Sequence, residues 1–107
     1  MEDRLIEKVI SEIKIELKDK FNDFMGVYFF GSRLNGTASI DSDYDLMFIF
    51  DREIDWRFEK EVLEIIYPYD IKYEIVIDYK IYSYKEMLDP STPFQLNVKR
   101  EGIFYGV

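Results

Sequence analysis

The chain contains no cysteine and no histidine. The lack of cysteine excludes a disulfide framework, and the lack of both residues excludes a Cys/His zinc site and an imidazole base. Any acid–base chemistry must therefore use carboxylates, with lysine or tyrosine as less suited alternatives. Cationic side chains are also scarce, because 14 Lys and Arg stand against 22 Asp and Glu, for a net charge of −8. Since nucleic-acid binding needs clustered cations on the protein, direct binding of a polynucleotide is not expected.

Long apolar runs are missing as well. No run approaches the ~20 residues that a membrane-spanning helix requires. The N-terminal sequence MEDRLIEKVI lacks the basic start and apolar centre of a signal peptide. We therefore expect no membrane association and a cytoplasmic location. Of the 107 residues, 48% are apolar, which suits one domain, residues 1–107, that buries roughly two-thirds of the surface of its unfolded form.

The spacing of apolar residues predicts the order of helices and strands. Residues 3–24 have helical spacing, with Asp3 as the expected N-cap and Gly26 as the expected stop. The pattern then predicts a strand at 27–30, one or two helical turns at 33–37 closed by Gly36, a loop at 40–42, a strand at 45–50, a helix at 56–66 after an Asp55 N-cap, a strand at 71–77, a short helix at 83–88, a helix at 93–100 after a Thr92 N-cap, and a strand at 103–105. These elements predict an α+β fold in which a mixed sheet of three to four strands packs against helices.

The most informative stretch is VYFFGSRLNGTASIDSDYDLMFIF, residues 27–50. Gly31 ends an apolar strand, where it permits a sharp turn and lets a ligand approach the backbone. A helix that starts there offers free N–H groups to an anion, and the Ser32 hydroxyl adds a donor for a phosphate oxygen. Asp43 and Asp45 are two residues apart on a strand, so their carboxylates point the same way and suit joint binding of Mg²⁺.

A third carboxylate from a neighbouring strand would complete a two-metal site, which activates an attacking hydroxyl and stabilises a leaving phosphate. Glu74 lies inside the predicted strand at 71–77. Asp78 is four residues further on, so its side chain would lie on the same face as Glu74. A purely structural interpretation, in which Glu74 is solvated beside Lys72, fits the residues equally well. The residues alone leave the third acid open between Glu74 and Asp78.

Two other ligand-binding motifs fail on this stretch. Asp41, Asp43 and Asp45 imitate the start of an EF-hand loop, but Leu46 replaces the required glycine and Arg52 replaces the closing glutamate. The two glycines of the stretch have P-loop spacing without the Lys-Ser/Thr pair that must follow. A polar turn before a strand explains Asp41, but it does not explain Asp45 within an apolar run.

Gly31-Ser32, followed ten residues later by Asp43-x-Asp45, resembles the signature of the DNA polymerase β-like nucleotidyltransferase superfamily. A four-residue match of this kind arises by chance in on the order of one chain per thousand of this length. The short chain is similar to the minimal nucleotidyltransferases, which are often encoded beside a helical HEPN-domain protein. The resemblance covers most of the chain, up to residues 98–102, and its specific part is the central motif.

The resemblance implies the nucleotidyltransferase (polymerase β-like) fold and the transfer of a nucleotidyl group from a nucleoside triphosphate to a hydroxyl, with release of pyrophosphate. By position, it implies nucleotide binding by Gly31, Ser32 and Arg33, and catalysis and binding of two Mg²⁺ ions by Asp43, Asp45 and Glu74. Family members commonly have aspartate as the third acid, so Glu74 is a departure with a longer reach. In members paired with HEPN toxins, the resemblance implies transfer of AMP from ATP to a toxin tyrosine, which silences the RNase and makes the enzyme an antitoxin.

Two alternatives stand beside this protein adenylyltransferase: a non-catalytic module that neutralises a partner by contact, and an enzyme that modifies a small molecule such as an antibiotic. The complete set of acids argues against the first. The short chain argues against the second, because it leaves little room for an acceptor pocket. The acceptor is therefore expected on a partner protein or on another copy of the chain, and an acidic chain suits a basic partner.

Overall fold

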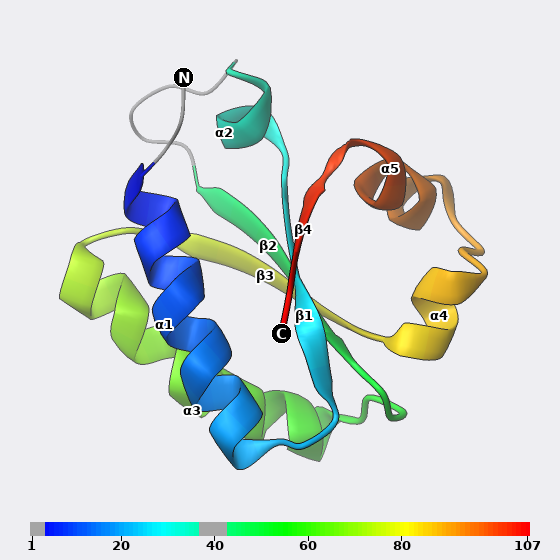
Figure 1. Ribbon diagram of the computed structural model, residues 1–107, viewed down its shortest axis with the longest axis horizontal. Helices are drawn as coiled ribbons and strands as arrows, with labels where there is room; N and C mark the ends of the chain where they lie inside the picture. Colours follow the sequence, from blue (N-terminus) through cyan, green and yellow to red (C-terminus); the bar gives the residue numbers. More distant parts are fainter. Residues whose placement is uncertain (1–3, 37–42) are drawn as a thin grey trace.

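The fold is a four-stranded β-sheet with helices on both faces (Figure 1). The computed structural model describes residues 4–36 and 43–107. In chain order, the elements are α1 (Arg4–Lys20), β1 (Phe24–Phe30), α2 (Ser32–Asn35), β2 (Tyr44–Phe50), α3 (Trp56–Tyr73), β3 (Ile77–Ser83), α4 (Tyr84–Leu88), α5 (Pro93–Glu101) and β4 (Ile103–Gly106). The strand order is β3-β2-β1-β4, and β2 and β3 are parallel while β1 is antiparallel to both of its neighbours. The predicted α+β architecture with a mixed sheet is therefore confirmed.

The sheet separates two cores, with α1 and α3 on one side and α4 and α5 on the other (Figure 1). Alternate residues of β2 explain this division, because successive side chains of a strand point to opposite faces. Tyr44, Leu46, Phe48 and Phe50 pack with α1 and α3. Met47 and Ile49 pack with α4 and α5. The predicted alternation along this strand is confirmed, and it places Asp45 on the α4–α5 face.

The first helix is shorter than predicted. Its buried positions follow the expected stripe: Ile6, Val9, Ile10, Ile13 and Leu17. The helix ends at Lys20, and Phe24 already begins β1. Gly26, predicted as the helix stop, lies inside that strand with a φ of 148°, and a Cβ there would come within 2.6 Å of the Tyr105 carbonyl oxygen. The prediction failed because the strand continues the apolar spacing of the helix without a gap. Asp3 and the predicted loop at 40–42 lie outside the described residues.

The largest difference from the sequence prediction concerns α3 and β3. The helix passes through Pro68 and continues to Tyr73, whereas we predicted that it would end near residue 66. The predicted strand at 71–77 is wrong, and the strand covers Ile77–Ser83 instead. Contacts with α1 stabilise the added turns, because the Tyr69 and Tyr73 hydroxyls donate hydrogen bonds to Glu16 and Glu12.

The elements after β3 follow the prediction closely, except that Ser83 caps α4 instead of beginning it. Asp55, Ser83 and Thr92 each cap a helix by accepting a hydrogen bond from a backbone N–H three residues later. Pro93 occupies the first turn of α5, where its missing N–H removes no helical bond. The last predicted strand is present as β4. Among the described residues, no helix has the length and hydropathy needed to cross a membrane.

Candidate active site

A tight turn at Gly31 brings the end of β1 against β2. Gly31 has a φ of 86°, in the left-handed region that favours glycine, and it directly precedes α2. A Cβ built on Gly31 would lie 2.0 Å from Oδ2 of Asp45, closer than any real contact. The short helix closes at Gly36, whose φ of 75° gives it a left-handed cap, as predicted. The turn glycine and the strand aspartate therefore pack directly against each other.

Asp45 also faces a carboxylate on the other neighbouring strand. In the register of the sheet it pairs with Phe30 of β1 and with Asp78 of β3. The pKa of Asp45 is raised to about 6, first by burial, next by a hydrogen bond with Asp78, and then by the negative charges of Asp78 and Asp43. A hydrogen bond between two carboxyl groups requires a proton between them. Below about pH 6 the pair therefore holds a proton, and above this pH it carries two negative charges side by side.

Asp43 precedes β2 and is exposed to solvent. Its charge raises the pKa of Asp45 and also that of Asp70 in α3, for which burial is the larger cause. Oδ1 of Asp70 is buried and has no hydrogen-bond partner within the described part of the chain. The charge of Asp43 thus acts both on Asp45 in the sheet and on Asp70 in α3. No three of the described acids are gathered closely enough to form a metal site as they stand, but carboxylate oxygens are the ligands that Mg²⁺ prefers, so the donor set fits this ion.

The residues after Gly31 lie at the same end of the sheet. Ser32 is the first residue of α2 and is half-buried. The guanidinium of Arg33 lies 4.4 Å from the centroid of the Tyr44 ring, and this cation–π contact holds it against a buried residue of β2. Of the three residues predicted to bind a nucleotide, Gly31 is in direct contact with Asp45 and Ser32 follows it in the chain. Arg33 packs on Tyr44, whose side chain lies on the opposite face of β2 from Asp45.

Residues 10–103 match the family model described as a nucleotidyltransferase domain. The chain belongs to this family. Its fold is similar to a crystal structure of a toxin–antitoxin with AMP-PNP, with a TM-score of 0.62 and 20% identity over 90% of this chain and 73% of that chain. It is also similar to a protein from Sulfolobus solfataricus that has been assigned as a nucleotidyltransferase, with a TM-score of 0.58 and 22% identity over 92% and 77%. No curated protein sequence matches the chain. The superfamily predicted from the central motif is thus confirmed.

The position predicted for Glu74 in this nucleotidyltransferase domain needs correction. Glu74 is not in a strand: it caps the C-terminal end of α3 with a φ of 52° and a ψ of 47°, and it is exposed. Its predicted position inside a strand at 71–77 is therefore wrong. Asp78, the alternative that the sequence left open, is the residue that stands opposite Asp45. Glu74 and Asp78 are an even number of residues apart, so strand alternation alone could not show which of them is the third acid. The pairing of β3 with β2 favours Asp78.

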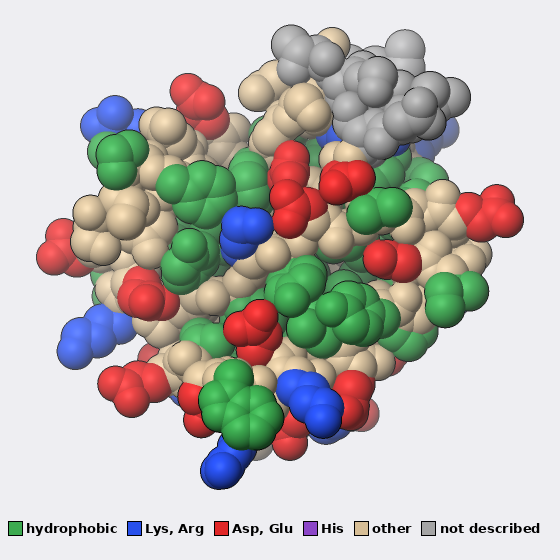
Figure 2. Space-filling model, turned by 180° about the vertical axis from the view of Figure 1, so that it is seen from behind, with side chains coloured by type: hydrophobic (Ala, Val, Ile, Leu, Met, Phe, Trp, Pro, Cys, Tyr) green, Lys and Arg blue, Asp and Glu red, His purple; other side chains and the backbone are tan. Residues whose placement is uncertain are grey.

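Sequence reasoning missed one residue that contacts these acids. Lys80 lies two residues beyond Asp78, and its Nζ forms an ion pair with Asp78 Oδ1 at 3.2 Å. The alternation of β3 could have indicated this neighbour once the strand boundaries were known. Asp70 belongs to α3, which packs on the other face of the sheet, and the charge of Asp43 is what links it to these acids. Figure 2 shows the molecule from behind, where acidic side chains lie close to a basic side chain beside the grey residues.

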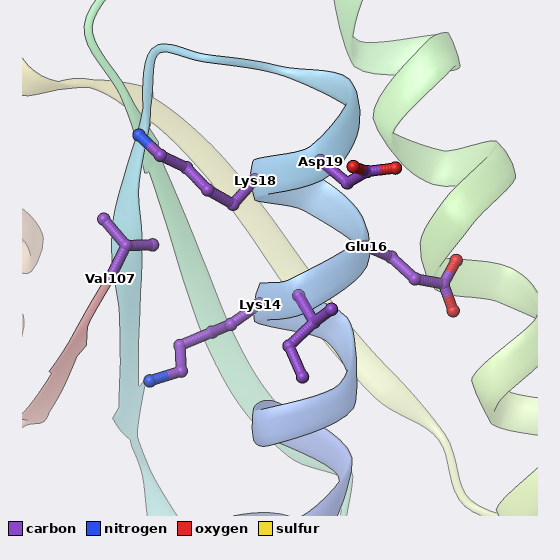
Figure 3. Close-up of a pocket in the computed structure, with 6 residues that line it drawn as sticks. Lys14, Glu16, Lys18, Asp19 and Val107 are labelled. Atoms are coloured by element: carbon purple, nitrogen blue, oxygen red, sulfur yellow. The ribbon is translucent and has the colours of Figure 1, made fainter.

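The volumes of the surface cavities do not identify the candidate active site. A groove of about 660 Å³ lies between α1 and the end of β4, lined by Lys14, Ile15, Glu16, Lys18, Asp19 and Val107 (Figure 3). Both lysines there donate hydrogen bonds to backbone carbonyls, Lys14 to Gly106 at 2.9 Å and Lys18 to Asn22 at 2.7 Å. A smaller crevice of about 150 Å³ between α2 and α5 includes Gly31 and Phe94 in its lining. This second crevice adjoins the turn and could receive part of a ligand bound there.

Proposed function

We propose that this nucleotidyltransferase is Mg²⁺-dependent and transfers AMP from ATP to the hydroxyl of a tyrosine on a partner HEPN toxin, so that it acts as an antitoxin. The observation that carries the proposal is the Asp45–Asp78 carboxylate pair packed against the Gly31 turn. A phosphate-binding turn beside carboxylates is the arrangement that nucleotidyl transfer needs, since the triphosphate and its metal ions must be held together.

Three carboxylates would hold the metal ions in this proposal: Asp43, Asp45 and Asp78. Asp78 replaces Glu74 as the third acid because it shares the face and register of Asp45. Bound Mg²⁺, with two ions expected, would neutralise the charge of the phosphates and lower the pKa of the attacking hydroxyl. In the reaction, the acceptor oxygen forms a bond to the α-phosphorus, the bond to the β-phosphate oxygen breaks, and pyrophosphate leaves.

The other residues of the site have supporting roles in the proposal. Gly31 leaves room for the Asp45 carboxylate and for close approach of a phosphate to the backbone. The Ser32 hydroxyl donates a hydrogen bond to a phosphate oxygen, and Arg33, held by the Tyr44 ring, supplies positive charge. Below about pH 6, Asp45 keeps a proton that must leave before a cation binds there. Because the pKa of Asp45 is about 6, metal binding should weaken below this pH.

The support for the proposed acceptor is less direct. The similar structure with AMP-PNP, an ATP analogue, is a toxin–antitoxin, which supports both the nucleotide and a protein partner for this chain. The chain carries a net charge of −8, so a basic partner would be attracted to it. A second copy of the chain has the same acidic charge and would be repelled, although homo-oligomers through other surfaces stay compatible with the proposal.

The test uses ATP labelled at the α-phosphate, Mg²⁺ and the HEPN protein proposed as the partner. We expect label on a partner tyrosine with the wild type and with the control Asp19→Ala, which changes an exposed acid at the end of α1. Asp43→Ala and Asp45→Ala should lose the label. Label that persists in both variants would contradict the metal assignment, and inhibition of the toxin without label would favour a binding module.

A further inference from the structure

Lys80 is a cation placed among the acids of the proposed site. It lies on β3, where it pairs with Met47 in the register, two positions after the Asp45–Asp78 pair. Because alternate residues of a strand share a face, Lys80 and Asp78 point to the same side of the sheet as Asp45. The ion pair between Lys80 Nζ and Asp78 Oδ1 measures 3.2 Å, and the two side chains are 42% and 49% exposed.

The other ion pairs of the described residues are elsewhere. Arg52 binds Asp23 where β2 ends, and Lys72 binds Glu12 across α3 and α1. Each of these joins two elements that are distant in the sequence and so holds parts of the fold together. The Lys80 pair joins two residues of one strand and ties no elements together. Its consequence is electrostatic, because it places a positive charge beside carboxylates that repel one another.

A lysine and a divalent metal ion compete for the same carboxylate oxygens. Asp78 can give its full negative charge to one of them at a time, so a bound metal ion weakens the hold on Lys80. Lysine has a flexible four-carbon stem and a compact charge that binds phosphate well. A nucleotide brings several negative charges to the site together with the metal ion. The ammonium group released from Asp78 would then have phosphate oxygens within reach.

We propose that Lys80 is an exchangeable counter-ion of this site, which pairs with Asp78 before the substrate binds and with a phosphate oxygen of the nucleotide once a divalent ion occupies the carboxylates. This role rests on the proposed function, because it needs both a metal ion and a nucleotide at the site. It makes Lys80 a nucleotide-binding residue in addition to Gly31, Ser32 and Arg33. It also gives Lys80 opposite effects on the two ligands, since it competes with the metal ion and attracts the nucleotide.

The opposite effects of Lys80 on metal-ion affinity and on nucleotide affinity can be measured by binding experiments alone. Mn²⁺ is titrated into the nucleotide-free protein, with free Mn²⁺ followed by electron paramagnetic resonance, and Mg·AMP-PNP binding is followed by calorimetry. We expect Lys80→Met to bind Mn²⁺ about three- to tenfold more tightly, because a competitor worth about 1 kcal/mol is gone. The same variant should bind Mg·AMP-PNP about tenfold more weakly, because a charge-assisted contact is lost. Lys80→Arg should recover most of the nucleotide affinity.

Lys72→Met is the matched control, since it removes an ion pair of similar exposure that lies on α3 and away from these acids. It should leave both affinities unchanged. If Lys80→Met binds Mn²⁺ no more tightly than the wild type, or if it binds Mg·AMP-PNP equally well, the role of Lys80 is wrong while the proposed function stands. If the wild type binds neither Mn²⁺ nor Mg·AMP-PNP, the proposed function itself is wrong. A thermal melt of each variant shows that a loss of binding does not come from unfolding.

Discussion

Gly31 and Asp45 are in contact in such a way that the residue at position 31 has no room for a side chain. A Cβ on Gly31 would lie 2.0 Å from Oδ2 of Asp45, 2.8 Å from its Cγ and 3.1 Å from its Cβ. Rotation of the Asp45 side chain about χ1 could relieve the contacts with Oδ2 and Cγ, but only by moving the carboxylate away, and the contact with Cβ requires a small shift of the residue itself. The glycine of the turn and the aspartate of the neighbouring strand thus form one unit, although fourteen positions of sequence separate them.

Gly31→Ala should therefore abolish binding of Mg·AMP-PNP while the protein still folds. The added methyl group moves the Asp45 carboxylate out of its place, and the φ of 86° adds strain of about 1–2 kcal/mol. Gly36→Ala is the control, because Gly36 has a φ of 75° and a Cβ added there would have no atom within 4 Å. It should lose a similar amount of stability and keep its affinity. Calorimetry and thermal melts separate the two effects, and equal affinities in both variants would count against the contact.

The choice between Asp78 and Glu74 as the third acid gives a second prediction. Asp78→Asn should reduce nucleotidyl transfer about 100-fold or more, since even outer residues of metal sites change affinity or activity by 10- to 100-fold. Glu74→Gln should change the rate less than twofold, because Glu74 is an exposed cap of α3. The measurement is the initial rate at several Mg²⁺ concentrations. A large loss in Glu74→Gln alone would reinstate the residue that the sequence first favoured.

Glu74 also allows a prediction about stability. Its φ of 52° is in the left-handed region, where a residue with a Cβ is strained by roughly 1–2 kcal/mol and glycine is not. Glu74→Gly should raise the free energy of unfolding by about 0.5–1 kcal/mol, after allowance for the greater backbone entropy of glycine in the unfolded chain. Glu74→Ala keeps the strain and should show no gain in urea unfolding. A gain of equal size in both variants would mean that the glutamate charge is responsible.

The raised pKa of Asp45 makes the stability of the metal-free protein depend on pH. The folded protein keeps a proton on Asp45 at pH values where the unfolded chain has lost it, so stability falls as the pH rises from about 3.8 to about 6. Asp45→Asn removes this effect. In EDTA at pH 8, we expect the variant to melt about 2–5 °C higher than the wild type, a modest gain because the site is partly solvated. At pH 4 the difference should disappear.

Glu64→Gln, an exposed change on α3, serves as the control for this experiment and should show no dependence of this kind. Added Mg²⁺ should raise the melting temperature of the wild type at pH 8 by linkage and leave Asp45→Asn nearly unchanged. A variant that is less stable than the wild type at pH 8 would show that the Asp45 carboxylate stabilises the metal-free fold, contrary to its raised pKa.

Local signals in the sequence were sufficient for much of the fold. The caps at Asp55, Ser83 and Thr92 depend on side chains that bond to their own next turn, so a short window contains the whole interaction. The alternation along β2 was visible for the same reason, because it repeats every two residues. The central motif likewise lies within one short stretch, and it led to the correct superfamily.

The errors came from interactions that no short window contains. Residues 72–77 alternate like a strand, and Pro68 suggests a helix end, yet α3 continues because Tyr69 and Tyr73 bond to α1. Because α3 is longer than predicted, the third strand starts six residues later than predicted, and a different acid faces Asp45. The residues that the sequence proposed for the site within one strand and its preceding turn, Gly31 and Asp45, are in contact in the structure. The third member of the site depended on the pairing of β3 with β2, which is a tertiary property.

Pro68 provides a direct test of how α3 is held together. Proline cannot donate the backbone hydrogen bond to the carbonyl of Glu64, and inside a helix it costs about 3 kcal/mol relative to alanine. The residue is exposed, so water can reach the unpaired carbonyl and reduce this cost. Pro68→Ala should therefore raise the free energy of unfolding by about 1–3 kcal/mol, which corresponds to a melting temperature higher by several degrees.

The matched control for Pro68→Ala is Glu61→Ala, an exposed change in the middle of α3 that should stay within about 0.5 kcal/mol of the wild type. Both are measured by urea unfolding and by nucleotide affinity. If Pro68 is needed to direct the chain into β3, Pro68→Ala would lose nucleotide affinity even while α3 became more stable, because Asp78 would leave its position opposite Asp45. A gain in stability with unchanged affinity would instead show that the α1–α3 contacts alone fix the start of β3 and so position the third acid.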